Sequence, residues 1–178
     1  MRNTIRNLVS EIVPFDEFEA HDRASTVAWI DSGAELCRFI KPATPPKHLI
    51  SYFVLFDQHK ILLVDHLNAR LWLPTGSHVE PNEHPTETVK RECREELGIE
   101  AQFIFEKPIF ISVTKTVGLT AGHTDVSLWY ALRGNSTHAV DFDQSEFAQV
   151  KWFDFVNVPM GRTDPHMERF LKKYTTLL

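Results

Sequence analysis

Residues 76–99 read GSHVEPNEHPTETVKRECREELGI, and the hexapeptide RECREE near the end of this stretch contains three glutamates. Carboxylates held this close repel one another unless a positive charge lies among them. A divalent cation would supply that charge. The first question is therefore whether the stretch folds so that its carboxylates face one place.

Residues 85–97 are predicted to form a helix. Pro85 stands in the first turn, where proline is favoured, and Gly98 follows the last turn, where glycine ends many helices. Val89, Cys93 and Leu97 recur every four residues, so they form an apolar row along one side. This row is the side expected to pack against a sheet, and it turns the thiol of Cys93 toward the core.

The three glutamates of RECREE are predicted to share a neighbouring side of this helix. Glu92, Glu95 and Glu96 stand three and four residues apart, and together they span about 100° of the helix circumference. Three carboxylates at one spot suit a hard cation such as Mg²⁺, which takes oxygen ligands and keeps several waters. Taken alone, the same pattern also fits a solvated surface of Glu and Arg side chains paired four residues apart.

The spacing around these glutamates resembles a known signature. Seven residues separate Glu83 from Arg91, and the chain then reads RECREELGI as far as Ile99. This is similar to the box of the Nudix hydrolases, G-x5-E-x7-R-E-U-x-E-E-x-G-U, in which U is a bulky apolar residue. Cys93 fills the first apolar position, and Ile99 fills the last. With the strands expected on either side, the resemblance covers residues 48–156.

The chain departs from this box at its opening glycine. Ser77 stands at that position, and Gly76 precedes it by one residue. A glycine permits positive φ or a close approach of the backbone to a ligand. If the backbone at Ser77 needs such a conformation, the serine adds strain. If its carbonyl oxygen binds the metal, serine supplies it as well as glycine.

The resemblance implies an α+β fold, an α/β/α sandwich around a mixed β-sheet, and hydrolysis of a nucleoside diphosphate linked to another group with Mg²⁺ or Mn²⁺. It implies an ion pair between Glu83 and Arg91, and it leaves open whether Glu92 or a later acid activates water. The implied metal ligands are Glu92, Glu95, Glu96 and Ser77. The implied catalytic residues are Glu83, Arg91, Glu92 and Glu95.

Composition describes an ordinary globular chain. The 178 residues are 43% hydrophobic and 24% charged, with a net charge of −5, which argues against a general attraction to nucleic acid or anionic membranes. The two cysteines lie in no CxxC pair, and no apolar run has the length of a signal peptide or a membrane span. We expect a soluble, cytoplasmic protein.

The chain divides near Pro42. Residues 1–41 are predicted to be a helical N-terminal extension, and residues 42–178 a Nudix domain. The extension could cap the pocket, pair two subunits or complete the core. Strands are expected at 49–57 and 61–66 as a hairpin, then at 71–74, 102–106, 107–116, 123–134 and 148–155. A final helix is expected at 165–178.

Further candidate site residues lie outside the box. In residues 123–130, alternation places His123, Asp125 and Trp129 on one face of a strand. That face could line a substrate pocket, or it could be a solvent-facing edge. Trp72 and Trp129 are candidates for stacking on a nucleobase, although core packing is the commoner role of an aromatic ring. Glu146 is the candidate for a further metal ligand or base.

Three functions remain open at this point. The first is a metal-dependent pyrophosphohydrolase acting on a small nucleotide, with homodimerisation an option that the family offers. The second is a Nudix domain that binds a nucleotide without cleaving it, with Ser77 marking the loss of activity. The third, nucleic-acid binding, is disfavoured by the acidic balance and the lack of a basic stripe.

Overall fold

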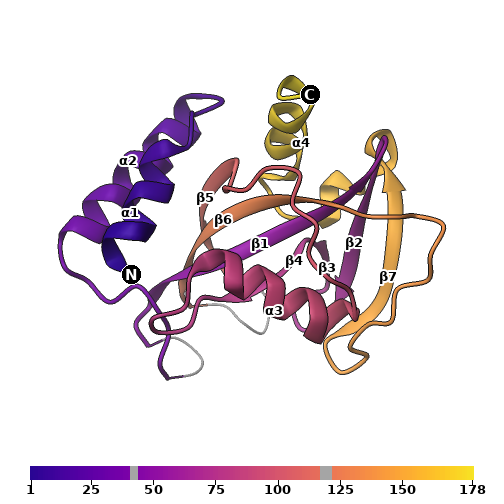
Figure 1. The fold of residues 1–178 in the computed structure, drawn as a ribbon, viewed down its shortest axis with the longest axis horizontal. Helices are drawn as coiled ribbons and strands as arrows, with labels where there is room; N and C mark the ends of the chain where they lie inside the picture. Colours follow the sequence, from indigo (N-terminus) through magenta and orange to yellow (C-terminus); the bar gives the residue numbers. More distant parts are fainter. Residues whose placement is uncertain (41–43, 117–121) are drawn as a thin grey trace.

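The computed structural model describes residues 1–40, 44–116 and 122–178. Helices and strands follow one another along the chain with two short 3-10 helices before the last helix (Figure 1). The elements are α1 (Arg2–Glu11), α2 (Glu17–Asp31), β1 (Lys47–Asp57), β2 (Lys60–His66), β3 (Leu71–Leu73), β4 (Thr75–His78), α3 (Pro85–Leu97), β5 (Phe110–Lys115), β6 (Thr124–Arg133), β7 (Phe147–Asp154) and α4 (Met167–Thr176).

The strands form one mixed sheet in the order β3-β2-β1-β6-β5, with β4 paired to β1 and β7 paired to β2. Strands β1 and β6 are parallel, and the other pairs are antiparallel. The expected hairpin of β1 and β2 is confirmed, with Asp57 opposite Lys60. Each strand of a sheet turns alternate residues to opposite faces, so both faces carry apolar side chains.

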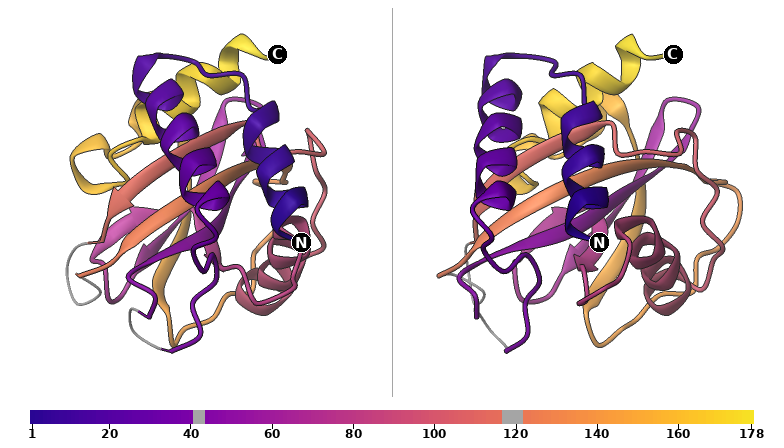
Figure 2. Two further views of the ribbon diagram at one scale, coloured as in Figure 1. Left: turned by 90° about the vertical axis from the view of Figure 1, so that its left-hand side faces the viewer. Right: turned by 60° about the vertical axis from the view of Figure 1, so that its left-hand side comes forward.

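The sheet lies between two helical layers, which confirms the predicted α/β/α sandwich (Figure 2). On one face, Phe53 and Leu55 of β1 belong to a core cluster that also includes buried residues of α1, α2 and α3. On the other face, Val54 and Phe56 pack in a cluster with α4. Neighbouring residues of one strand therefore serve separate cores.

The N-terminal helices complete the first of these cores. Helices α1 and α2 lie side by side (Figure 2), and Ile5, Val9 and Ile30 are almost fully buried in the same cluster as the sheet. The expected boundary between residues 41 and 42 falls outside the described residues and stays a prediction. Among the described helices, none combines the length and the apolar character needed to cross a bilayer.

One expected strand is absent, and one observed strand was not expected. Residues 102–106 form no strand, because β5 already occupies most of the adjacent edge of β6 and only Phe103 makes an isolated bridge, to Leu132. Strand β4 was not expected, because Thr75–His78 has no apolar alternation. It forms where its backbone meets β1, with Gly76 opposite Tyr52.

Candidate active site

Helix α3 forms as its end signals predict. The side chain of His84 accepts a hydrogen bond from the backbone N–H of Thr86, Pro85 occupies the first turn, and Gly98 closes the last turn with a φ of 62°. The row of Val89, Cys93 and Leu97 is fully buried against the sheet, as expected. The helix is thereby fixed with its glutamate side toward β4, with which it is in contact.

The three box glutamates differ in exposure. The side chain of Glu95 is 61% exposed, whereas that of Glu92 is 6% exposed and Glu96 is also buried. Glu92 and Glu96 therefore lie at the inner edge of the helix, near β4, and Glu95 lies at the rim. This arrangement differs from a solvated Glu/Arg surface, in which all three would be exposed.

The ion pair between Arg91 and Glu83 is present and bidentate. Nε of Arg91 lies 3.0 Å from one carboxylate oxygen of Glu83, and Nη2 lies 3.1 Å from the other. Glu83 also accepts hydrogen bonds from Thr88 Oγ1 at 2.7 Å and from the backbone N–H of Glu80 at 3.0 Å. The remaining nitrogen of Arg91 contacts Glu92. The loop before α3 is thus tied to the carboxylate side of the helix.

Strand β4 approaches β1 so closely that only glycine fits at position 76. Gly76 has a φ of 142°, and a Cβ added there would lie 2.1 Å from the backbone oxygen of Ser51. Ser77 is absent from the non-glycine residues of positive φ in the described chain. The conformational demand falls on Gly76, and the backbone at Ser77 carries no such strain. The hydroxyl of Ser77 lies beside Glu92. This contact opposes the rise in the pKa of Glu92 that burial causes.

The buried carboxylates are short of positive charge. Burial raises the pKa of Glu96 well above its ordinary value, and the nearby charges of Glu92 and Glu146 add to this shift. Burial also raises the pKa of Glu92, although Arg91 opposes the shift. Oε2 of Glu96 has no hydrogen-bond partner among the described residues. An oxygen-only donor set with an unpartnered buried oxygen fits a hard divalent cation such as Mg²⁺.

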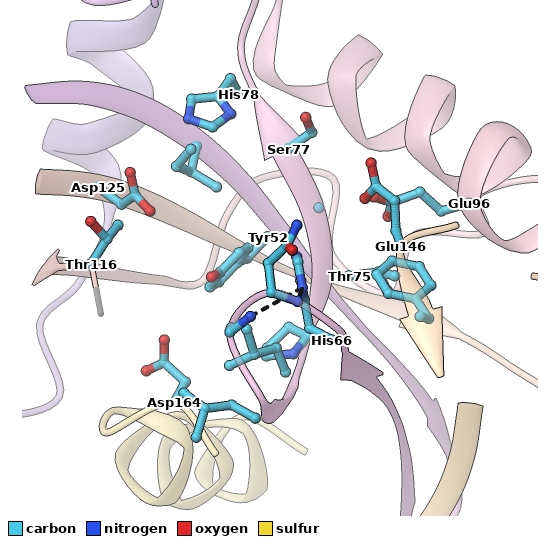
Figure 3. A pocket seen from close by; sticks show the side chains of 18 of the residues that line it. Tyr52, His66, Thr75, Ser77, His78, Glu96, Thr116, Asp125, Glu146 and Asp164 are labelled. Carbon is cyan, nitrogen blue, oxygen red and sulfur yellow. Dashed lines mark hydrogen bonds between the residues drawn. The ribbon is translucent and has the colours of Figure 1, made fainter. Parts of the chain in front are cut away.

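Two adjoining cavities open beside these carboxylates, with volumes of about 390 and 380 Å³. Glu96 and Glu146 lie at one end of the larger cavity, and His78 and Asp125 lie at the other (Figure 3). Glu92 and Glu95 line the smaller cavity. Residues shared by both cavities are Arg38, Ser77, His78, Glu96 and Glu146.

The structure brings together most of the residues expected outside the box. His123, Asp125 and Glu146 all line the larger cavity. Glu146 reaches it from the segment just before β7, and the two others reach it from the start of β6. The alternation expected along β6 is observed, because Val126, Leu128 and Tyr130 pack on the opposite face.

The two tryptophans pack in the core, which is the commoner of the two roles that the sequence left open for them. Trp129 is fully buried, and its indole N–H donates to Ser112 Oγ at 2.9 Å. Trp72 is 8% exposed and packs edge-on against Phe153. Neither lines either of the two cavities described above. Trp129 shares the face of His123 and Asp125, but it lies further along the strand, under α4, where the sheet is covered.

Sequence reasoning missed several residues of the larger cavity. Tyr52 lies in the middle of it, and Asp164 enters from the segment before α4 (Figure 3). Burial raises the pKa of Asp164 to about 6, and it raises the pKa of Tyr52 well above its ordinary value. The sequence did carry a signal for Tyr52, because it is an aromatic residue with a polar hydroxyl within an apolar strand. It carried no signal for Asp164, because the position of Asp164 depends on where α4 packs.

Comparisons with known proteins agree with this site. The model of the NUDIX domain family matches residues 46–174, which is more than half of the chain. An uncharacterized Nudix hydrolase, YvcI of Bacillus subtilis, is 29% identical over 130 residues, covering 70% of this chain and 79% of YvcI. The family match includes the whole carboxylate helix.

Solved structures show the same fold. A NUDIX-family hydrolase from Clostridium perfringens is similar with a TM-score of 0.58 and 20% identity, covering 74% of this chain and 98% of that one. The NUDIX domain of Shewanella oneidensis NrtR, complexed with ADP ribose, is similar with a TM-score of 0.57 and 18% identity, covering 78% and 93%. The sandwich fold and the carboxylate helix are those of the Nudix hydrolases. With the family match over residues 46–174, this chain belongs to the Nudix family.

Proposed function

We propose that this Nudix hydrolase cleaves a pyrophosphate bond in a nucleoside diphosphate linked to a further group, with Mg²⁺ or Mn²⁺ held by Glu92, Glu95, Glu96 and the carbonyl oxygen of Ser77. The observation that carries the proposal is the buried, unpartnered carboxylate oxygen of Glu96 at the junction of two cavities. A group that is costly to bury without a partner is retained where a ligand completes it.

Arg91 and Glu83 act in this proposal as positioning residues. Their bidentate pair holds the loop against α3, and Arg91 also contacts Glu92. Both side chains are thereby set before substrate arrives, which is how preorganised groups lower a barrier. When bound, the divalent cation makes a coordinated water more acidic and offsets the charge of the diphosphate.

Proton acceptance falls to a carboxylate beside the two cavities. Glu92 lines the smaller cavity, and as the base it would act on water instead of binding the metal. Glu146, from the opposite wall, is the alternative base. The two differ in their surroundings: Glu92 contacts Arg91, and Glu146 is exposed.

The larger cavity is the proposed place for the group linked to the diphosphate. Its volume of about 390 Å³ lies within the range of small-molecule sites. Tyr52 offers a protonated hydroxyl and an aromatic ring, and His123 and Asp125 offer polar atoms. The ADP ribose complex of the NrtR NUDIX domain supports a diphosphate-linked ligand, because that compound belongs to the proposed substrate class.

The test is chromatographic detection of the cleaved nucleotide products from a panel of nucleoside triphosphates, nucleotide sugars, dinucleotide polyphosphates and coenzymes, because only the triphosphates release free phosphate or pyrophosphate. We expect turnover that requires Mg²⁺ or Mn²⁺ and falls by about 100-fold or more in Glu96→Gln and Glu95→Gln. Glu100→Gln is the matched control, because Glu100 is an exposed acid just beyond α3, paired with Arg94. We expect it to retain activity.

The same experiment separates hydrolysis from a binding-only role. Nucleotide binding by calorimetry, with no turnover on any compound, would contradict the proposal and favour a nucleotide-binding module. Turnover that survives both Glu95→Gln and Glu96→Gln would place the chemistry away from α3 and would also contradict it.

A further inference from the structure

Three histidines and one aspartate meet at the end of the larger cavity that lies away from Glu96. His48 belongs to β1, His78 ends β4, and His123 and Asp125 come from the start of β6. One ligand atom of each residue lies within 4.8 Å of the others. The register of the sheet causes this convergence, because His48 lies directly opposite Asp125 in the parallel pair of β1 and β6.

The atoms at the centre of this His/Asp cluster lie close together. Nε2 of His48 is 2.9 Å from Nε2 of His78 and 3.1 Å from Oδ1 of Asp125. Nε2 of His123 is 3.3 Å from the same Oδ1. His48 is fully buried, and His123 is 5% exposed. These are short separations for groups that are rich in lone pairs.

The tautomer of His48 places two hydrogen-bond acceptors opposite each other. Its Nδ1 lies 3.0 Å from the backbone oxygen of Pro45. A carbonyl oxygen only accepts, so Nδ1 carries a proton, and Nε2 of a neutral ring is a lone-pair acceptor, to which Nε2 of His78 can donate at 2.9 Å. That lone pair faces a carboxylate oxygen at 3.1 Å. Two acceptors at this distance, removed from water, need a positive charge between them.

A single proton does not complete the cluster. Oδ1 of Asp125 is buried without a hydrogen-bond partner among the described residues, although two imidazole nitrogens lie within 3.3 Å of it. The nitrogens are close to Oδ1 but not aimed at it. Ligand atoms directed toward a common point, rather than toward one another, have this geometry. A hydrogen-bonded relay would align each donor with its acceptor.

We propose that His48, His78, His123 and Asp125 bind a divalent transition metal of the zinc class, at a site separate from the box carboxylates. Three imidazoles and one carboxylate are donors that Zn²⁺ accepts in tetrahedral geometry. With bonds of about 2.0–2.1 Å, the ligand atoms of a tetrahedron lie about 3.3 Å apart. Three of the six separations, at 2.9, 3.1 and 3.3 Å, are close to this value, and the widest, at up to 4.8 Å, closes only if the ligand side chains move inward when the metal binds.

The contact behind His48 also favours metal binding. The bond from His48 Nδ1 to a backbone carbonyl is the outer contact that commonly orients a metal-binding histidine.

The site goes beyond the proposed function, and it differs from the box in its ligands and its place. Mg²⁺ takes oxygen ligands in octahedral geometry, so a nitrogen-rich cluster selects a different ion. Figure 3 shows Asp125 and His78 across the cavity from Glu96 and Glu146. A metal there joins β1, β4 and β6, and because His78 follows Ser77, it also fixes one end of the box loop.

The first test is calorimetric titration of ZnCl₂ into the metal-free full chain in excess MgCl₂, so that the box is filled. We expect one equivalent of zinc to bind. His123→Gln and Asp125→Asn should each weaken zinc binding by about 100-fold or more, because each removes one of four ligands. His66→Gln is the matched control, since His66 lines the same cavity outside the cluster, and Glu95→Gln is the control for the box.

The second test needs no variant that could misfold. Co²⁺ added to the wild-type chain should give the intense visible absorption of a tetrahedral nitrogen-and-oxygen complex, and Zn²⁺ should displace it. No zinc binding, a weak octahedral cobalt spectrum, or zinc binding that is lost in Glu95→Gln but kept in His123→Gln would overturn the inference. A wild-type chain that hydrolyses a nucleotide but binds no zinc would overturn this inference and leave the proposed function standing. The two proposals can therefore fail separately.

Discussion

The peptide at Gly76 runs against β1 with no room for a side chain, and the next residue bears the side chain that departs from the family pattern. A Cβ at position 76 would also lie 2.9 Å from the Cα of Tyr52. Ser77 follows without positive φ and pairs with Ser51 in the ladder. The chain therefore meets the need for glycine one residue earlier, and Ser77 gives no physical reason for lost activity.

Substitutions at these two positions should have opposite results. Gly76→Ala places a methyl group against backbone atoms that cannot move away, so we expect a loss of about 2–4 kcal/mol in the free energy of unfolding. Ser77→Gly removes only a hydroxymethyl group and should change stability by less than about 1 kcal/mol. Urea unfolding of both variants measures this. A gain in stability for Ser77→Gly would show that the backbone at Ser77 is strained after all.

Asp164 should make stability depend on pH. Burial raises the pKa of Asp164 from 3.8 to about 6, so the folded state holds a proton that the unfolded state has released. Stability is present in full below about pH 4 and falls as pH rises through 6. Asp164→Asn removes this loss and can keep the hydrogen bond that Oδ1 accepts from His166 N.

The expected gain for Asp164→Asn is roughly 2–3 kcal/mol at pH 7.5 and close to zero at pH 4, from the size of the pKa shift. Denaturant unfolding of metal-free protein at both pH values gives the measurement. An equal effect at the two values would mean that burial of the charge is not the cause.

Helix α3 carries two arginines whose roles separate clearly. Arg91 pairs with Glu83 and contacts Glu92, and its side chain is 27% exposed. Arg94 makes an equally bidentate pair with Glu100, at 2.9 and 3.0 Å, but both partners are exposed. Exposed pairs contribute little to stability. An ion pair that orients a buried carboxylate also affects how well that carboxylate binds a metal ion.

Arg91→Lys should therefore weaken the use of Mg²⁺. Lysine keeps the charge but loses the fork that holds both oxygens of Glu83. We expect the Mg²⁺ concentration for half-maximal activity to rise about 10- to 100-fold, as for other outer partners of metal ligands. Arg94→Lys, on the same helix, should change it by less than about 2-fold. A similar shift in both variants would assign the effect to helix stability alone.

At the scale of the whole molecule, one buried carboxylate of the N-terminal helices makes contacts with both the sheet and the last helix. Oε1 of Glu19 accepts hydrogen bonds from Lys173 Nζ at 2.7 Å and from the backbone N–H of Ile111 at 3.2 Å, and Oε2 accepts from Phe15 N at 2.6 Å. Glu19 is fully buried, and the Lys173 side chain is 6% exposed. This side chain links α2, β5 and α4, so the extension is part of the fold.

Glu19→Gln should be among the most destabilising conservative changes. It leaves the ammonium group of Lys173 buried without a charge partner, which typically costs about 3–5 kcal/mol. Glu17→Gln is the control on the same helix, because Glu17 is exposed, and it should change stability by about 0.5 kcal/mol or less. Thermal unfolding compares the two. Equal midpoints would mean that the pair contributes nothing to holding the helices on the sheet.

Local elements were predictable wherever their signals were local. The bounds of α3 follow from Pro85 and Gly98, and its buried row follows from the spacing of Val89, Cys93 and Leu97. Strand β4 and the missing strand at 102–106 were not predictable, because each depends on which edge of the sheet is free. Distant segments of the chain decide which edge of the sheet is left unpaired, so the local sequence carries no information about it.

The sequence alone determined the family and the carboxylate helix, because spacing along a helix fixes which side chains share a side, and the resemblance implied the pairing of Glu83 with Arg91. Only the tertiary structure decided that Trp129 is core and that His48 meets His78, His123 and Asp125. Those residues are brought together by the parallel register of β1 with β6 and by the pairing of β4 with β1. Register joins residues far apart in the chain, and a one-residue shift would turn these side chains to the other face.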